Sequence, residues 1–343
     1  MEDILDSLRR AMISQGWVFG ERMNRIGDPF KWVDGDQLSQ FRRIDGSLAF
    51  LQFLSMSGEI YETPKDIRTA DADEILRKIE ARLQEAFDHF VPFRSAEQMQ
   101  FGKYIKSTAS VKQQDYCAIK TFCKDLGKNI NHLDLGPGLG ANAIYSRLGF
   151  DSTYYSLEAF PASYACQRSF FRFLASDKPH YLDLIDCENY GLTTAEISAA
   201  LNNKTKFRYK HVPSWQFELV EASSIDLATA TWVLNEVNPA GICWLLYNVT
   251  RSLKTGGYFY IRDSFKLKPL RHDLNYDDFL LQKLGFERVG LLDIQNRVDM
   301  HGIPRAYRKT AKAPELDFET LFETAFGRFA VTAHNGSYMQ KGK

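Results

Sequence analysis

The chain has 343 residues, of which 44% are hydrophobic and 25% are charged, an ordinary globular composition that excludes a wholly disordered chain. Lys and Arg (43 together) balance Asp and Glu (43 together), so no overall field favours nucleic acid or an anionic membrane. The 5 cysteines are scattered without a C-x-x-C pair, which indicates reduced thiols. No run approaches about 18 apolar residues and the start of the chain has no signal-peptide core, so we expect a cytoplasmic protein without a membrane span.

Residues 1–128 are predicted to form a mostly helical cap that helps to build an acceptor pocket. The polar run 102–110 is interpreted either as a linker or as a lid over a ligand, and a helix over 111–126 follows it. Apolar residues recur at helical spacing near the start of the chain (Ile4, Leu5, Leu8, Met12, Ile13) and again after Ala72 (Ile75, Leu76, Ile79, Leu83, Ala86, Phe87).

The stretch 130–148 carries the strongest signal in the chain. The apolar run 130–135 ends in Gly136, Gly138 and Gly140 and passes directly into a helical pattern. This is the strand, glycine turn and helix of a site for a nucleotide-like ligand. The glycines let the backbone approach that ligand, because a Cβ at Gly136 or Gly138 would collide with it.

Two acidic residues accompany these glycines. The glycines with Ala141 also satisfy the dinucleotide pattern G-x-G-x-x-A, so they do not decide the cofactor alone. Asp134, two residues before the first glycine, suits a cationic amino-acid ligand better than a pyrophosphate, which it would repel. Glu158 closes the next apolar run, where an acid can accept both hydroxyls of a ribose in NAD and S-adenosyl-L-methionine (SAM) sites alike.

Alternating strand and helix patterns after the glycine turn predict a mostly parallel sheet with helices on both faces. An insertion over 175–206 separates the second strand from a third over 207–212. A fourth strand over 225–234 and, after a tight turn at 254–257, a fifth over 258–262 follow. A helix over 276–284 and a hairpin with strands near 288–294 and 305–310 close the fold.

Residues from about 130 to 310 resemble the class I SAM-dependent methyltransferases. The run from Asp134 to Gly140 is similar to their first motif, D-x-G-x-G-x-G, and a closing hairpin with an antiparallel last strand is a feature that ordinary dinucleotide folds lack. The later landmarks are Leu253 to Gly257 and Leu284 to Phe286, each before an apolar strand. The resemblance implies a Rossmann-like, seven-stranded class I methyltransferase sheet with an N-terminal helical region, and SAM as cofactor.

A narrower resemblance, to the sugar O-methyltransferases of bacterial surface-polysaccharide loci, rests on the runs 155–161, 211–215, 235–237 and 254–260. The chain departs from that family in having Leu157-Glu158 where an aspartate is common, and in lacking a Met after Glu236. The resemblance implies methylation of a sugar hydroxyl, on a nucleotide sugar or a surface polysaccharide, in polysaccharide biosynthesis.

Further cofactor residues are expected where strands end, because the carboxyl ends of strands in an open α/β sheet line the ligand crevice. Ser214 and Trp215 follow the third strand, an edge that meets the adenine in many SAM sites. Ser214 is a hydrogen-bond candidate there, and Trp215 either stacks on the adenine or packs in the core. Asn235 follows the fourth strand and is assigned to the cofactor.

Methyl transfer to a hydroxyl is an in-line displacement that requires a base. Glu236, after the fourth strand, is the first candidate, although it is equally placed to cap the next helix. His272 and His301 follow as candidates, each with a surface role as the alternative. Asp263 is interpreted as orienting a base or joining Glu236 at a divalent ion, but the spacing gives no metal motif and no metal is assigned.

The predicted organisation is a cap (1–128), a SAM-binding methyltransferase domain (129–310) and a helical tail (311–343). The tail docks either on this subunit or on a second copy in a homo-oligomer. Two rival functions stay open, an NAD(P)-dependent oxidoreductase and a non-catalytic scaffold subunit with a SAM fold. The acceptor is expected to be a small molecule or saccharide, since no Asn-Pro-Pro-Tyr or Asp-Pro-Pro-Tyr motif of nucleic-acid methylation follows the fourth strand.

Overall fold

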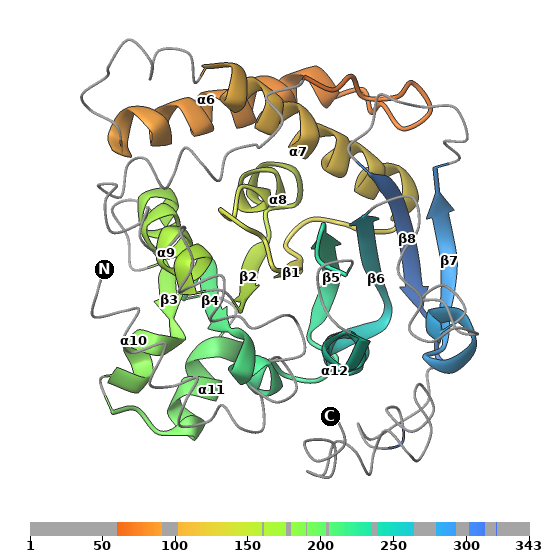
Figure 1. Cartoon of the computed structure of the whole chain (residues 1–343). Coiled ribbons are helices and arrows are strands. Elements are labelled where there is room, and N and C mark those ends of the chain that lie inside the picture. The colour runs from red at the N-terminus through yellow and green to blue at the C-terminus, as the bar shows by residue number, and fades with distance from the viewer. Residues whose placement is uncertain are drawn as a thin grey trace, which may run out of the picture.

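The computed structural model of the chain (Figure 1) describes residues 60–90, 102–159, 161–175, 180–189, 191–203, 206–234, 239–263, 279–292, 302–312 and residue 320. The helical stretch expected near residues 4–13 and nearly all of the expected tail lie outside these ranges. None of the described helices is long and apolar enough to cross a lipid bilayer.

A mixed sheet of eight strands, counted over the described ranges, forms the centre of the fold, in the order β3-β4-β2-β1-β5-β6-β8-β7. The sequence predicted seven strands, so the strand count was wrong, whereas the mixed α/β architecture is confirmed. The strands are β1 (Asn131–Leu135), β2 (Thr153–Glu158), β3 (Tyr181–Asp183), β4 (Tyr209–Pro213), β5 (Ile225–Thr231), β6 (Leu253–Asp263), β7 (Phe286–Leu291) and β8 (Ile303–Lys309).

The eighth strand is β3, which comes from the insertion over 175–206. It is three residues long and pairs in parallel with β4, with Tyr181 opposite Tyr209 and Asp183 opposite His211. A three-residue strand has no room for a periodic apolar pattern, so the sequence gave no signal for it. The insertion also holds α10 (Leu184–Asn189) and α11 (Thr194–Asn202), which starts with a Thr193 and Glu196 capping box.

Strand β8 runs against its neighbours. It is antiparallel to both β6 and β7, and it lies between them in the sheet although β7 precedes it in the chain. Five neighbouring strands of the sheet are parallel to one another: β4, β2, β1, β5 and β6. Apart from the added β3, this order and the single reversed strand are the class I methyltransferase arrangement expected from the closing hairpin.

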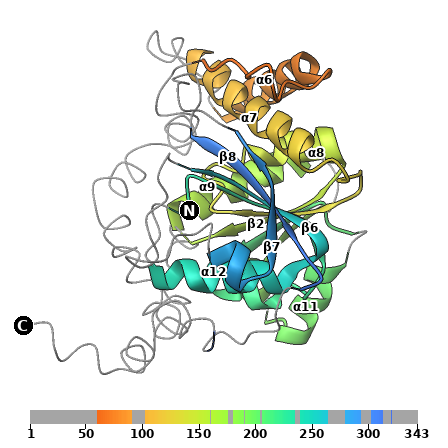
Figure 2. The same ribbon diagram turned by 90° about the vertical axis from the view of Figure 1, so that its right-hand side faces the viewer.

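Helices cover both faces of the sheet, as Figures 1 and 2 show. One face is covered by α7 (Gly102–Phe122), α8 (Asn142–Phe150) and α9 (Pro161–Ala175), with α6 (Ala72–Phe90) packed outside α7 and α8. The other face is covered by α11 and α12 (Pro239–Ser252), with the 3₁₀ helix η2 (Ser214–Leu219) and the short π-helix η3 (Phe279–Lys283) beside them. Each face has its own apolar core, so every central strand is buried on both sides.

Two helices of the expected N-terminal region are seen in the described residues. The periodic apolar positions of α6 are buried as predicted, whereas the polar run 102–110 is the first half of α7 and neither a linker nor a lid. That run looked like a loop because Ser107, Thr108 and Ser110 are polar, but all three are buried in the packed helix. Polarity of small hydroxyl residues is therefore a poor sign of a loop here.

The fifth expected strand is longer than predicted. Strand β6 begins at Leu253, and residues 254–257 lie inside it as an irregular segment between two paired stretches. Leu253 pairs with Ile225 and Tyr258 pairs with Leu227, so the four intervening residues leave the regular ladder, with Gly256 at φ +84°. The predicted tight turn is thus a bulge in the strand.

A fully buried ion pair ties α7 to the end of β6. Arg262 donates to both carboxylate oxygens of Asp115, through Nε at 2.5 Å and Nη2 at 3.0 Å. The Tyr260 hydroxyl donates to the same carboxylate at 2.8 Å. The Arg262 charge holds the pKa of Asp115 below its ordinary value even though burial acts in the opposite direction. The position of α7 over the sheet therefore depends on these two charges.

We predict that Asp115→Leu lowers the free energy of unfolding by about 3–5 kcal/mol, because it leaves the Arg262 guanidinium buried without its carboxylate. Urea unfolding measures this loss. The matched control is Asp125→Leu, since Asp125 is 72% exposed, lies 3.7 Å from Arg308 and is expected to contribute no more than about 1 kcal/mol. Equal losses in the two variants would contradict the prediction.

Candidate functional site

The candidate site lies at the carboxyl ends of β1, β2, β4, β5 and β6, where parallel strands bring the ends of their sequences to one edge. Strand β1 passes there into the glycine turn and then into α8. The turn is attached to the neighbouring strand by the Gly136 N–H, which donates to the Leu157 carbonyl at 2.8 Å. The predicted strand, glycine turn and helix are therefore present.

The three glycines of the turn have different surroundings. All three have positive φ angles, +54° at Gly136, +61° at Gly138 and +87° at Gly140. A Cβ at Gly136 would lie 3.0 Å from the Val233 side chain, and one at Gly140 would lie 2.6 Å from the Phe171 ring. A Cβ at Gly138 would meet no atom within 4 Å. Gly136 thus faces Val233, two residues after the end of β5, whereas Gly138 borders open space. That these glycines make room for a ligand stays a prediction.

Asp134 is fully buried at the end of β1 and is held by three elements. Its carboxylate accepts hydrogen bonds from Asn142 Nδ2 at 2.8 Å, from Thr229 Oγ1 at 2.6 Å and from the Tyr154 hydroxyl. Burial raises the pKa of Asp134, and the three hydrogen bonds act against that rise. Asp134 therefore joins β1 to α8, β2 and β5, a role that the sequence did not reveal. Contact with a ligand remains a prediction.

His132, two residues earlier on the same face of β1, continues this network. The Thr229 hydroxyl donates to Asp134, so it accepts from His132 Nε2 at 2.8 Å, and His132 Nδ1 accepts from Ser146 at 2.6 Å. The Ser152 hydroxyl completes the chain by donating to Ser146 at 2.5 Å. Burial lowers the pKa of His132 to about 3, so its ring is neutral. His132 is therefore a hydrogen-bonded histidine of the core.

Glu158 ends β2 and is almost completely buried. Its carboxylate accepts from the Ala159 N–H at 2.8 Å and from Gln167 Nε2 at 2.7 Å. The same Gln167 amide donates to the Gly138 carbonyl at 2.5 Å, and its oxygen accepts from Ser156 at 2.5 Å. Gln167, on α9, thereby links the acid to the glycine turn. The structure brings these two predicted features together through a residue that the sequence did not single out.

The end of β4 lies beside Glu158, because Glu158 pairs in register with Pro213. Ser214, one residue further on, is buried. Trp215 is partly buried and packs against Tyr164 and Ile185, and its indole N–H has no hydrogen-bond partner among the residues that the structure describes. The packing role left open for Trp215 is thus seen in the described residues, whereas its contact with an adenine remains a prediction.

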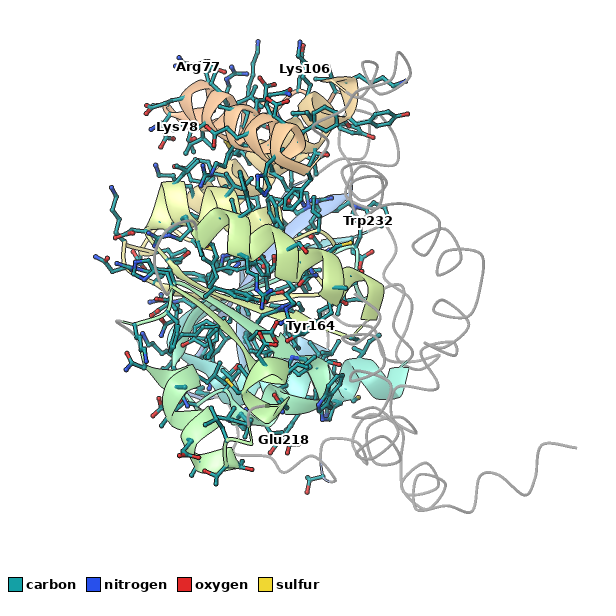
Figure 3. The ribbon with its side chains drawn as sticks, turned by 90° about the vertical axis from the view of Figure 1, so that its left-hand side faces the viewer. Arg77, Lys78, Lys106, Tyr164, Glu218 and Trp232 are labelled. Carbon is teal, nitrogen blue, oxygen red and sulfur yellow. The ribbon has the colours of Figure 1, made fainter. Side chains whose placement is uncertain are left out.

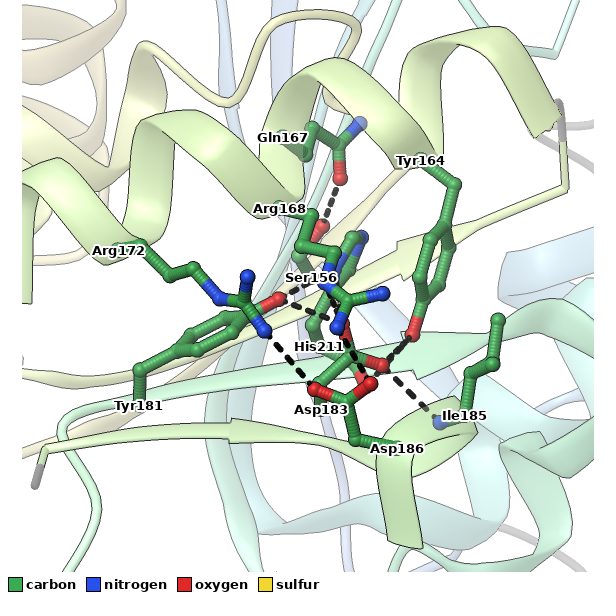
Figure 4. A network of polar contacts seen from close by, with 10 residues as sticks. All are labelled: Ser156, Tyr164, Gln167, Arg168, Arg172, Tyr181, Asp183, Ile185, Asp186 and His211. Atoms are coloured by element: carbon green, nitrogen blue, oxygen red, sulfur yellow. Dashed lines mark hydrogen bonds and ion pairs between the residues drawn. The ribbon is translucent and has the colours of Figure 1, made fainter. Parts of the chain in front are cut away.

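Beneath this edge lies a polar network that Figure 4 shows. The Asp183 carboxylate accepts from the hydroxyls of Tyr164 and Tyr181, both at 2.8 Å, and lies 3.6 Å from Arg168. His211 stacks on Tyr164 with ring centroids 3.5 Å apart, and its Nδ1 lies 3.1 Å from the Tyr181 hydroxyl. Burial drives the pKa of His211 well below its ordinary value. The network fixes α9 and β3 against β4.

The candidate catalytic residues are seen only in part. Asn235, Glu236, His272 and His301 lie outside the described residues. Asp263, at the end of β6, is fully buried. Side chains alternate along a strand, so Asp263 points to the face opposite Arg262, which binds α7. That face of the sheet is the one covered by α12. The role of Asp263 beside a base stays a proposal.

The residue directly after β5 has an unusual backbone. Trp232 has a φ angle of +58°, a left-handed conformation that is rare for a bulky side chain, and its N–H donates to the Arg262 carbonyl at 2.8 Å. Strained backbone of this kind is concentrated at functional sites. Figure 3 labels Trp232 just below the helical layer in the upper part of the view, and Glu218 near the bottom.

A groove of about 820 Å³ lies elsewhere, between α11, η2 and α12, and is lined by residues such as Glu218, Leu219 and Arg251. Leu219 precedes β5 and Arg251 precedes β6, so this groove is at the amino ends of the strands, away from the glycine turn. Among the described ranges, no group of three or more His, Cys, Asp or Glu side chains is arranged to hold a metal ion.

Four residues missed from the sequence complete the site: Asn142, Tyr154, Gln167 and Thr229. Three of them did carry a signal. Thr229 and Tyr154 are polar groups inside apolar strands, and Gln167 is an uncharged polar residue one turn before two buried phenylalanines of α9. A buried polar side chain requires a hydrogen-bond partner, so each of these positions implied one.

No protein-family model matches the chain, and no curated protein matches it. The solved structures similar to it include the cyclase SpnF (14% identity, 60% of this chain and 83% of that chain, TM-score 0.39) and a SAM-dependent methyltransferase from Aquifex aeolicus (12% identity, 53% and 83%, TM-score 0.34). Another is the phosphoethanolamine N-methyltransferase 1 of Haemonchus contortus, in complex with phosphoethanolamine and S-adenosylhomocysteine (10% identity, TM-score 0.39). The match covers 76% of this chain but only 55% of the Haemonchus chain.

The buried neutral His132 makes stability depend on pH. Its pKa in the native state, about 3, is below the ordinary value of 6.5, so the unfolded chain binds one more proton between these pH values. As the pH falls below 6, the free energy of unfolding of the wild-type protein should therefore decrease. We expect this decrease to be smaller in His132→Gln, by about 1.4 kcal/mol per pH unit. Urea unfolding at pH 7.5, 6 and 5 measures both slopes. Parallel slopes for the two proteins would refute the assignment.

Proposed function

We propose that the protein is a SAM-dependent methyltransferase. The observation that carries the proposal is the sheet: a glycine turn after β1, an acid at the end of β2, and a reversed β8 inserted between β6 and β7. A dinucleotide fold shares the glycine turn and the acid but not the reversed strand. The arrangement of strands supports the fold class, and the residues at the edge of the sheet support SAM as the cofactor.

The residues at this edge fit SAM, which would supply an electrophilic methyl group on a sulfonium. Gly138 borders open space, so its backbone is free to lie against the cofactor. Glu158 lies beside it, linked through Gln167, in a position to accept from the ribose hydroxyls. The unpaired indole N–H of Trp215 and the buried Ser214 lie at the next strand end and suit the adenine, with Asn235 as a further contact.

The proposed acceptor is a hydroxyl of a sugar, in a nucleotide sugar or a surface polysaccharide. Its support is the sequence resemblance around the ends of β2, β4 and β5, together with the aromatic and polar edge that those ends form. An alcohol becomes a competent nucleophile only as its proton leaves, so we assign Glu236 as the base, with His272 and His301 as the alternatives. Asp263 is assigned to orient that base.

The first test is binding of SAM, S-adenosylhomocysteine, NAD and NADP to the purified protein, measured in parallel by thermal unfolding and calorimetry. A ligand that binds only the native state raises its apparent stability, by about 2.7 kcal/mol at a concentration 100 times the Kd. We expect stabilisation by SAM and its product alone. Stabilisation by NAD or NADP alone would replace the proposal with an oxidoreductase.

The glycine turn gives a sharper test of where the cofactor lies. We predict that Gly138→Ala weakens SAM binding about tenfold or more at a stability cost of only about 1–2 kcal/mol from its left-handed backbone. Gly140→Ala should instead mainly reduce stability, since its Cβ would collide with Phe171. Gly127→Ala, where a Cβ meets nothing within 4 Å, is the control. Undiminished SAM affinity in Gly138→Ala would place the cofactor elsewhere.

Turnover separates an enzyme from a scaffold subunit. Glu236→Gln should retain SAM affinity and lose methyl transfer to sugar acceptors by about 100-fold or more, the range of a lost general base. Transfer of a radioactive methyl group from SAM to nucleotide sugars and polysaccharide fragments measures it. A wild-type protein that binds SAM but methylates none of them, with a Glu236→Gln variant identical to it, would favour the scaffold.

A further inference from the structure

Three polar groups from α7 and α8 lie near the same charged residues of the sheet and do not complete their interactions within the described part of the chain. Lys112 comes from α7, and Asn142 and Tyr145 come from the first turns of α8, directly after the glycine turn. The face of the sheet beneath them carries Asp134 on β1 and Arg262 on β6. These residues lie at the same strand ends as the proposed cofactor site.

The position of Lys112 follows from the packing of α7. It lies on one stripe of the helix with Ile105, Ala109 and Tyr116, at spacings of seven, three and four residues; these three are buried, and Lys112 itself is partly buried. Asp115, three residues later on that stripe, is bound to Arg262. Lys112 therefore points at the sheet, one helical turn away from the Asp115 and Arg262 pair.

The hydrogen-bonding capacity of this group is only partly used. Asn142 Nδ2 donates to Asp134, which identifies its Oδ1 as the free acceptor, and this buried oxygen has no partner in the described part of the chain. The Tyr145 hydroxyl is also buried and likewise finds no partner among the described residues. Lys112 makes no hydrogen bond or ion pair with any residue that the structure describes. Buried polar groups in native proteins are nearly always paired, so the two buried oxygens point to a ligand, and the partly buried Lys112 ammonium adds a charge beside them.

The charges around Lys112 define what kind of ligand fits. The Asp115 carboxylate is already neutralised by Arg262, and the Asp134 carboxylate accepts three hydrogen bonds. Burial lowers the pKa of the Lys112 ammonium, while Asp115 and Asp134 act in the opposite direction. A carboxylate placed between the Lys112 ammonium and the Tyr145 hydroxyl would give each donor an acceptor. An amine beside it would donate to Asn142 Oδ1.

We infer that Lys112 and Tyr145 bind the carboxylate of the amino-acid end of SAM, and that Asn142 accepts from its ammonium group. The inference rests on the proposed function and deepens it. It makes α7, from the N-terminal region, a direct part of the cofactor site. The bidentate contact between Asp115 and Arg262 would then fix α7 against the sheet and so set the distance between Lys112 and the cofactor.

The experiment compares calorimetric binding of SAM and of decarboxylated SAM, which lacks only the carboxylate. We expect the wild-type protein to prefer SAM by about 10- to 100-fold, the range of a charge-assisted hydrogen bond. Lys112→Met should remove that preference by weakening SAM binding while leaving the affinity for decarboxylated SAM unchanged. Lys112→Arg should retain part of the preference, and Tyr145→Phe should reduce it by less than Lys112→Met does.

The matched control is Lys106→Met, on the same helix. Figure 3 shows Lys106 on the outer side of the helical layer, and its side chain is exposed, so its removal should not change the ratio. A Lys112→Met protein that keeps the wild-type ratio, or that loses both ligands equally, would overturn the inference while leaving the proposed function intact. A wild-type protein that binds neither ligand would overturn both.

Discussion

The buried carboxylate of Asp134 is the constraint on which the rest of the site depends. A charge removed from water is tolerated only where donors replace its hydration, and Asp134 receives them from α8, β2 and β5. The hydrogen bonds to this one side chain therefore fix the distances between β1 and both neighbouring strands and set the direction in which α8 leaves the glycine turn. His132 extends the same constraint to Ser146 on α8 and to Ser152, which directly precedes β2. A ligand at Gly138 would thus rest on a turn whose two ends cannot move independently.

A second constraint couples the helical layer to this turn. The ion pair of Asp115 with Arg262 holds α7 against β6, while the Trp232 N–H, at the end of β5, donates to the Arg262 carbonyl. One arginine thereby connects α7, β6 and the strained end of β5. Because both charges are buried, their separation would cost several kcal/mol, so α7 and the strand ends move as one unit. In a methyltransferase this rigidity is useful, since in-line transfer depends on close alignment of donor and acceptor.

The parts of the fold that the sequence predicted are those with long periodic patterns. The buried positions of α6, the run before Gly136 and the apolar strands β5 and β6 all repeat over several residues, and the reversed hairpin could be predicted from its landmarks. Strand β3 was missed because three residues carry no period. The predicted start of α7 was too late because its polar serines and threonine suggested a loop, although they are buried in the helix. The acids and glycines of the site were found by motif, but the motif does not reveal what binds them. Gln167 and Thr229 act through contacts with residues 9 and 95 positions away, which no local pattern encodes.

The charges at the strand ends distinguish the two cofactors that the glycine pattern allows. Asp134 and Glu158 are both buried beside the glycine turn. The buried cation Arg262 is already paired with Asp115. The pyrophosphate of a dinucleotide would bring two further negative charges to a turn that already lies between two carboxylates. In these buried surroundings the repulsion between the negative charges would be only weakly screened. SAM, the proposed cofactor, would bring a sulfonium and an ammonium with a single carboxylate, to which we assign Lys112. The net positive charge of SAM would balance this edge, whereas a dinucleotide would add negative charge to it, so in the proposed site the acids that stabilise the turn also favour SAM.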